Sequence, residues 1–151
     1  MSELEADTGQ ARSSIQVVES FLEALKANDL ALALSLMSDD VVYQNVPLPP
    51  DRGKAKVERT LRSFMRVASE FDVHMHNIAA HDGVVLTERT DFLRGALLDL
   101  EFWVCGTFEV RDGKIVLWRD RFDIAEFTLQ LLTSPLRGLM RGLRSLIEER
   151  Q

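Results

Sequence analysis

The chain is poor in the features that would assign it at once to several functional classes. Its single cysteine, Cys105, cannot form an internal disulfide and favours a reducing compartment. No apolar run approaches the length of a transmembrane helix, and the acidic first residues lack the basic start of a signal peptide. A net charge of −6 provides no basic field for nucleic acid. These absences predict a soluble, cytoplasmic protein without a nucleic-acid partner.

What is present is the composition of a globular domain. Of 151 residues, 46% are hydrophobic and 28% are charged, which is enough for one buried core. Residues 1–11 are polar and acidic, and they are predicted to form a flexible tail. Residues 12–151 are then expected to form a single domain.

Apolar residues at helical spacing mark helices at both ends of the chain. The first helix is predicted to begin at Ser13 or Ser14, and the second begins after Asp29 and extends to Met37. A third follows Gly53. Near the C-terminus, Pro135 is expected to separate two further helices, over 125–132 and 136–147.

Between these helices the pattern is that of strands. A short strand is predicted over 41–46, followed later by four longer ones over 72–80, 84–93, 100–110 and 114–122. Asp-Gly pairs at 82–83 and 112–113 predict tight turns, so the strands that they join are antiparallel. The order of elements predicts an α+β fold, in which helices cover one face of a curved sheet and leave a deep apolar cavity.

Strand alternation predicts which side chains face this cavity. In the strand over 100–110 the inward set is apolar. It consists of Leu100, Phe102, Val104, Gly106, Phe108 and Val110. In the strand over 114–122 the set with Val116, Trp118 and Phe122 is the more apolar, and it carries Asp120 inward. Arg119 and Arg121 are then expected to point outward.

Five polar residues are expected to meet inside. Arg89 and Asp91 lie two apart on one strand and share a face, and so do Tyr43 and Asn45. A buried Asp120 needs a partner, and Arg89 is the nearest candidate. Tyrosine and asparagine can both orient a water molecule. The residues alone leave two interpretations open: a satisfied polar network in the core, or an active site.

Three segments together resemble the limonene-1,2-epoxide hydrolase family. They are 43–50 (YQNVPLPP), 87–91 (TERTD) and 118–123 (WRDRFD), within a similarity from about Ile15 to Gly138. The resemblance implies the cone-shaped fold of nuclear transport factor 2 and the ketosteroid isomerases, with a mixed, mainly antiparallel sheet. It also implies a homodimer and a one-step, cofactor-free hydrolysis of an epoxide without a covalent intermediate.

The resemblance also implies roles for the five polar residues. Asp91 would be the general acid, Asp120 the general base, and Tyr43 and Asn45 the groups that hold the attacking water. Arg89 would bridge the two carboxylates. Arg121 stands where the family usually has tyrosine, on the face predicted to point outward, so it should not touch the reaction.

The expected substrate is a hydrophobic epoxide of the terpenoid, steroid or fatty type, because the predicted lining of the cavity is apolar. This lining consists of Leu22, Leu25, Phe64, Leu93, Phe102, Val104, Trp118, Phe122 and Phe127. Two alternatives remain, an isomerase or cyclase of the same fold and a non-catalytic lipid-binding module. An isomerase needs a base and an oxyanion donor, whereas this polar set offers an acid and a water site.

Two other signals are given less weight. His74 and His76 share a strand face, but a catalytic metal needs a third protein ligand, and we predict no metal. The last helix carries an apolar stripe, formed by Leu136, Leu139, Met140, Leu143, Leu146 and Ile147. Such a stripe more often closes a cavity or packs on a partner subunit than lies on a membrane.

Overall fold

A single six-stranded sheet organises the chain in the computed structural model, which describes residues 3–148. Its strands are β1 (Met37–Val46), β2 (Asp51–Arg52), β3 (Glu70–His81), β4 (Val84–Arg94), β5 (Asp99–Arg111) and β6 (Lys114–Arg121). They lie in the order β2-β1-β6-β5-β4-β3. Only the β1–β6 pair is parallel among these neighbours. The predicted mixed, mainly antiparallel sheet is therefore confirmed.

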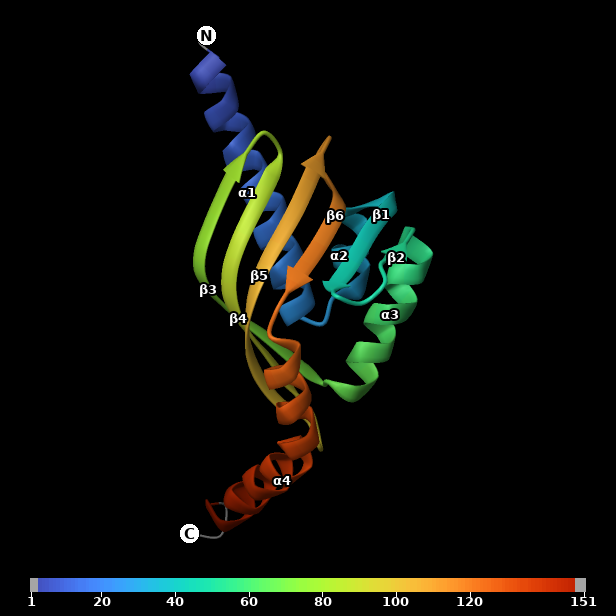
Figure 1. Ribbon diagram of the computed structural model, residues 1–151, viewed down its shortest axis with the longest axis vertical. Coiled ribbons are helices and arrows are strands. Elements are labelled where there is room, and N and C mark those ends of the chain that lie inside the picture. The colour runs from blue at the N-terminus through green and yellow to red at the C-terminus, as the bar shows by residue number, and fades with distance from the viewer. Residues whose placement is uncertain (1–2, 149–151) are drawn as a thin grey trace.

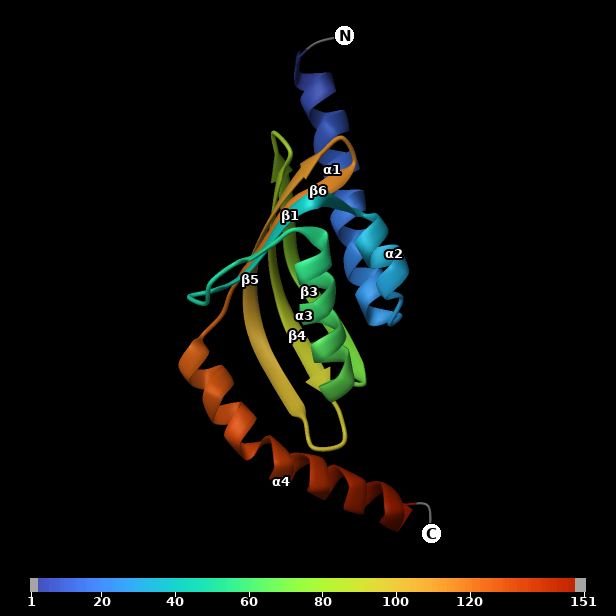
Figure 2. The ribbon, with the colours of Figure 1, turned by 90° about the vertical axis from the view of Figure 1, so that its right-hand side faces the viewer.

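Four helices accompany the sheet: α1 (Glu3–Lys26), α2 (Leu30–Ser35), α3 (Lys54–Val67) and α4 (Ile124–Glu148). Figure 1 shows the curved strands side by side, and Figure 2 shows α1, α2 and α3 on one side of them. α4 contacts β5 and passes beyond the end of the sheet. The α+β architecture with helices on one sheet face agrees with the prediction.

The two Asp-Gly turns have the backbone conformation that their sequence favours. Asp82 and Gly83 have φ angles of 48° and 74°, and Asp112 and Gly113 have 49° and 72°. Positive φ at both central residues is the feature of the hairpin turn whose twist matches that of the flanking strands. These turns join β3 to β4 and β5 to β6, and because β4 also pairs with β5 the four strands form a continuous antiparallel meander.

Three predicted helix boundaries are wrong. α1 begins at Glu3, well before Ser13, because the intervening residues are mostly helix formers that need no apolar stripe. Met37 begins β1 instead of ending the second helix. Pro135 lies inside a continuous α4, which bends along its length in Figure 2. The flexibility of residues 1–11 stays a prediction, and Met1 and Ser2 lie outside the described residues.

The predicted inward face of β5 is confirmed, and a β-bulge changes the start of β6. The register shifts so that Val110 pairs with Ile115 and Glu109 pairs with Leu117. Ile115 is therefore fully buried and the inward placement predicted for Val116 is wrong, because an unpaired residue reverses the alternation. Trp118 and Asp120, which follow the bulge, are buried as predicted.

α4 is attached to the domain through polar side chains. Gln130 Nε2 donates to the carbonyl of Glu101 at 2.6 Å, and its Oε1 accepts from the Glu101 N–H at 2.9 Å. Ser134 Oγ accepts from the N–H of Asp99. The ladder between β5 and β6 ends at Cys105, so these side chains bond a part of β5 that β6 does not reach.

The apolar stripe of α4 faces away from the sheet. Its exposed members are Leu129, Leu132, Leu136, Leu139, Met140, Leu143 and Ile147. The side chain of Leu146, predicted on the same stripe, lies outside the described residues. Within 3–148 the helices are all too short or too polar to cross a membrane.

Candidate active site

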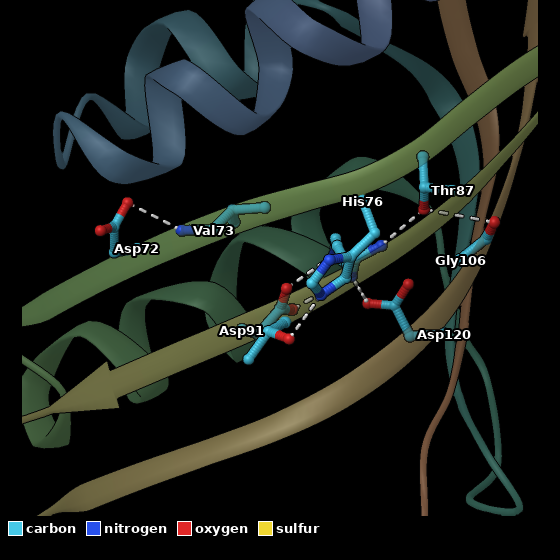
Figure 3. A network of polar contacts seen from close by, with 9 residues as sticks. Asp72, Val73, His76, Thr87, Asp91, Gly106 and Asp120 are labelled. Carbon is cyan, nitrogen blue, oxygen red and sulfur yellow. Dashed lines mark hydrogen bonds and ion pairs between the residues drawn. The ribbon is translucent and has the colours of Figure 1, made fainter.

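A fully buried arginine joins two aspartates at the centre of the sheet. Arg89 Nε lies 2.8 Å from Asp91 Oδ1, and its Nη2 lies 3.2 Å from Asp91 Oδ2. The same Nη2 donates to Asp120 Oδ2 at 2.7 Å (Figure 3). The remaining nitrogen, Nη1, donates to Thr87 Oγ1 at 2.9 Å. The structure thus brings together the acid, cation and acid that strand alternation placed on one face.

The sheet register explains how these residues meet. Thr87, Arg89 and Asp91 alternate along β4 and share its inward face. Asp120 lies on β6, so the guanidinium must reach across β5, where Gly106 pairs with both Thr87 and Asp120. A Cβ at Gly106 would collide with Arg89 Nη1 and lie 2.9 Å from Asp120 Oδ1. Glycine at this position leaves the space that the guanidinium occupies.

Tyr43 and Asn45 complete the polar set from the parallel neighbour of β6. Tyr43 pairs with Trp118 and Asn45 pairs with Asp120. Asn45 Nδ2 donates to the Tyr43 hydroxyl at 2.7 Å, and the Tyr43 ring packs on Trp118 with centroids 4.2 Å apart. Both side chains line the cavity into which Asp91 and Asp120 also open.

Two buried polar atoms at this site have no hydrogen-bond partner among the described residues. They are Oδ1 of Asp120 and Nε1 of Trp118. Leaving a buried polar atom unpaired destabilises a fold by about 1–3 kcal/mol, and more if it is charged. Such atoms in a cavity wall indicate a place where a polar ligand binds.

Burial favours the neutral form of both aspartates. It raises the pKa of Asp91 to about 6, with the charge of Asp120 adding to the effect and Arg89 opposing it. Burial also raises the pKa of Asp120, while Arg89 and the indole of Trp118 oppose it. Two close carboxylates beside one cation are expected to share a single proton.

The other two ionisable groups keep their usual forms. Burial lowers the pKa of Arg89, but the negative charges of Asp120 and Asp91 raise it by more, so the guanidinium stays protonated. Burial, aided by the charge of Asp120, raises the pKa of Tyr43, so the phenol stays neutral.

The cavity in front of the aspartates has a volume of about 120 Å³ and a mostly apolar wall. Of the predicted lining, the structure places these residues on the wall: Leu25, Phe64, Leu93, Phe102, Trp118, Phe122 and Phe127. Leu22 and Val104 were also predicted to line the cavity, and this prediction is wrong. They are 3% and 0% exposed and are buried in the core clusters instead of lining the cavity.

Sequence reasoning missed several residues of this wall. They are Lys26, Asn28, Leu61, Met65, Ala68, Ser69 and Phe71. Leu61 and Ala68 recur at helical spacing with Phe64, so the sequence pattern could have identified them. Thr87 and Gly106 were missed as partners of Arg89, because only the cross-strand register reveals them.

His74, His76, Cys105 and Arg121 are not part of the cavity wall. The rings of His74 and His76 are 4.8 Å apart, and His76 Nε2 lies 2.8 Å from Thr90 Oγ1. Cys105 and Arg121 are exposed, in agreement with the predicted outward face. No group of three or more His, Cys, Asp or Glu side chains is arranged for a metal in the described part of the chain.

The fold and the buried Asp–Arg–Asp set define the class of protein. The fold is that of nuclear transport factor 2-like proteins. A solved protein of this fold from Burkholderia pseudomallei, of unknown function, superposes with a TM-score of 0.72. The match covers 79% of this chain and 97% of the other at 16% identity, which shows the fold alone.

The chain belongs to the limonene-1,2-epoxide hydrolase (LEH) family, whose catalytic-domain model matches residues 12–133. Epoxide hydrolase EphG of Mycobacterium tuberculosis is 40% identical over 147 residues, which cover 97% of this chain and 93% of the relative. The structure of an LEH-like epoxide hydrolase from M. tuberculosis matches with 39% identity and a TM-score of 0.75. That match covers 89% of this chain and 98% of the other.

These matches confirm the resemblance found in the sequence: the protein is an LEH-like epoxide hydrolase. They favour hydrolysis over the alternatives of an isomerase, a cyclase or a lipid-binding module. A putative ketosteroid isomerase from Kribbella flavida has a TM-score of 0.65 at 14% identity, covering 75% of this chain and 79% of the other, and so shares the fold alone.

Proposed function

We propose that the enzyme converts a hydrophobic epoxide to a vicinal diol by direct attack of water. Asp120 removes a proton from the water as its oxygen bonds to an epoxide carbon. The carbon–oxygen bond of the ring breaks, and the leaving oxygen takes the proton of Asp91. All atoms balance without a covalent intermediate or a cofactor.

The observation that carries this mechanism is the unpaired Oδ1 of Asp120, a residue that lines the same cavity as Tyr43 and Asn45 and pairs with Asn45 across the sheet. A water there would donate one proton to Asp120 and the other to the amide oxygen of Asn45. The Tyr43 hydroxyl, which already accepts from Asn45, keeps its own proton for the water oxygen. The second oxygen of Asp120 is bonded to Arg89, so the carboxylate is held in one orientation.

The family resemblance assigns the acid to Asp91, and its raised pKa supports that role because the carboxyl keeps its proton to higher pH than an ordinary aspartate. Its pKa is raised to about 6, and the charge on Arg89 stabilises the ionised form left after the proton is given. Arg89 holds its protons throughout and does not line the cavity. It is therefore a positioning residue that links the two carboxylates.

The wall and the outer sheet face support the remaining parts of the proposal. An apolar wall suits a terpenoid, steroid or fatty epoxide. We further propose a homodimer through the outer face of the sheet, where Trp103 is 49% exposed and Cys105 is also exposed. A cytoplasmic location agrees with the single, unpaired cysteine.

A single-turnover reaction in heavy-oxygen water tests the direct attack. The label should appear in the diol in the first turnover. Label recovered in an aspartate of the enzyme would instead demonstrate a covalent intermediate. Asp91→Asn and Asp120→Asn should each lower kcat by roughly 10²–10⁴-fold without unfolding the protein. Asp112→Asn, in an exposed turn, is the matched control and should leave kcat unchanged.

A further inference from the structure

We propose that the indole N–H of Trp118 donates a hydrogen bond to Asp120 in the working site and so keeps this carboxylate, instead of Asp91, in the ionised form that a base needs. This inference rests on the proposed hydrolysis and adds a positioning residue to it. Trp118 would decide which of the two carboxylates holds the shared proton.

The contacts of Arg89 alone favour the wrong distribution of this proton. Asp91 accepts from two nitrogens of Arg89, Nε at 2.8 Å and Nη2 at 3.2 Å. Asp120 accepts from Nη2 alone, at 2.7 Å. Both aspartates are almost fully buried, so the larger number of N–H donors makes Asp91 the better stabilised anion and leaves the proton on Asp120. The proposed roles require the opposite, and Asp120 therefore needs a further donor.

Trp118 can provide this donor. Its Nε1 is buried without a hydrogen-bond partner among the described residues, and so is the acceptor Oδ1 of Asp120. The two residues alternate on β6, and both line the cavity. Burial raises the pKa of Asp120, while Arg89 and then Trp118 lower it, which agrees with an indole close to the carboxylate. Pairing the two orphaned atoms would stabilise both.

The other donors at the site are already engaged. Asn45 Nδ2 donates to the Tyr43 hydroxyl, and Arg89 Nη1 donates to Thr87. An indole nitrogen can only donate, so Trp118 neither gives up its proton nor takes one during the reaction. A carboxylate oxygen has two acceptor sites, and Oδ1 can therefore accept from the indole and from the attacking water together.

Few ionisable groups face Asp120. Arg89 and Asp91 approach it from β4, and Tyr43 comes from β1. From α1, Lys26 lines the same cavity but forms ion pairs with two exposed carboxylates. The residues that α3 and α4 contribute to the described cavity wall are apolar. Removing the indole N–H should therefore act on the proton equilibrium of the Asp–Arg–Asp set alone.

Two variants remove the N–H of Trp118. The ring packs on Phe21 and Tyr43, with centroids 5.0 Å and 4.2 Å away, so Trp118→Phe also leaves space in the core. Replacing Trp118 by 3-benzothienylalanine keeps the bicyclic shape and puts a sulfur in place of the N–H. The second variant thus separates the hydrogen bond from the packing.

The pH profile of kcat/KM with limonene 1,2-epoxide, a neutral probe, tests the inference. Both variants should raise the midpoint of the acid limb by about one to two pH units, because Asp120 takes up its proton at higher pH. The alkaline limb, which reports Asp91, should stay near 6. Trp103→Phe is the matched control, since that exposed indole bonds Glu88 at 3.3 Å, and both limbs should stay in place. A benzothienyl variant with an unmoved acid limb would overturn the inference.

Nuclear magnetic resonance tests the contact without any turnover. The chain has two tryptophans, so a nitrogen-15 spectrum contains two indole signals, and Trp103→Phe assigns them. The Trp118 signal should move downfield as Asp120 ionises; Asp120→Asn should abolish this titration and Asp91→Asn should retain it. A Trp118 signal that does not follow Asp120 refutes the contact, whatever the activity. The expected titration in a protein that hydrolyses no epoxide supports the contact and refutes the hydrolysis alone.

Discussion

Arg89 determines the charge state of the candidate active site. Its guanidinium is fully buried and bonded to Asp91 and Asp120, so it can neither leave nor lose its charge. With both aspartates ionised the three residues would carry a net charge of −1 in a poorly solvated place. One shared proton would neutralise the group, and the proposed mechanism uses that proton to protonate the leaving oxygen.

The pH dependence of the reaction follows from this shared proton. The pKa of Asp91 is raised to about 6, so the acid loses its proton as pH rises through that value. We expect kcat/KM to fall on the alkaline side of a midpoint near 6, and to fall again in stronger acid as the site takes up a second proton. A pH–rate profile with a neutral epoxide measures both limbs; a rate that is constant from mildly acidic to alkaline pH would contradict the role of Asp91.

The free energy of unfolding should also depend on pH through Asp91. The pKa of Asp91 is higher in the folded chain than its ordinary value of 3.8, so folding binds protons. Its contribution to stability is complete below 3.8 and is lost as pH rises through about 6. In Asp91→Asn, the free energy of unfolding should therefore decrease less over this interval than in the wild type.

Gly106 is a residue whose side chain must be absent. Because a Cβ there would meet Arg89 and Asp120, Gly106→Ala should displace the guanidinium. We expect a loss of about 1–3 kcal/mol in the free energy of unfolding and a large fall in kcat. Gly142→Ala is the control: nothing lies near that position in α4, and alanine favours a helix, so urea unfolding should show equal or higher stability.

Single residues were predictable from the sequence where alternation alone placed them. The spacing of Arg89 and Asp91 gave their common face, and the apolar neighbours of Asp120 indicated its burial. Gly106 was predicted inward, but its contact with Arg89 was not, because that contact depends on how three strands align. Lys26 was missed for a related reason, since a polar residue at a helix end reaches the cavity only through tertiary packing.

Among the elements, α4 is attached to the sheet by the side chain of Gln130, which bonds the edge of β5 where a neighbouring strand would otherwise pair. Gln130 donates to and accepts from the backbone of Glu101, as a neighbouring strand would. The first turn of α4 also supplies Phe127 to the cavity wall. The attachment of the helix therefore shapes the site as well as the fold.

Gln130→Met keeps the length of the side chain and removes both hydrogen bonds. Two backbone groups of Glu101 lose their partner, so we expect a loss of about 1–3 kcal/mol in urea unfolding. The exposed Gln16 of α1 provides the control, and Gln16→Met should change stability by less than about 0.5 kcal/mol. Equal stabilities of the two variants would show that α4 is held by other contacts.

The existence of the long strands and turns was predicted more accurately than the residues at which elements begin, end or shift register. The four long strands and both Asp-Gly turns follow from alternation and turn chemistry. The bulge beside Val110 could not be predicted, because no local residue type requires it. Pro135 was treated as a break, yet a helix can continue through a proline when it gives up one hydrogen bond and bends.

For the whole molecule, the curved sheet uses its two faces differently. The inner face holds the cavity and the helices, while the outer face exposes Trp103, Leu86 and Cys105. The general form was predictable from the order of helices and strands. The outward direction of the α4 stripe was not, because it is set by the polar contacts of Gln130 and Ser134 with β5.

The proposed dimer is tested by a charge on the outer sheet face. Trp103→Glu should shift the protein from dimer to monomer in sedimentation equilibrium, because a carboxylate would be buried against the partner. Leu132→Glu places the same charge on the α4 stripe, at a residue that is 74% exposed, and should leave the dimer intact. If Leu132→Glu gives a monomer and Trp103→Glu stays a dimer, the interface is formed by α4 instead of the outer sheet face.

The attachment of α4 also affects the tendency of this protein to aggregate. The part of β5 beyond β6 would have free N–H and C=O groups along one edge if α4 did not bond Asp99 and Glu101. Unpaired strand edges recruit strands from other molecules and start aggregation. By covering this edge, α4 keeps the sheet from growing across molecules, a protective role that is independent of catalysis.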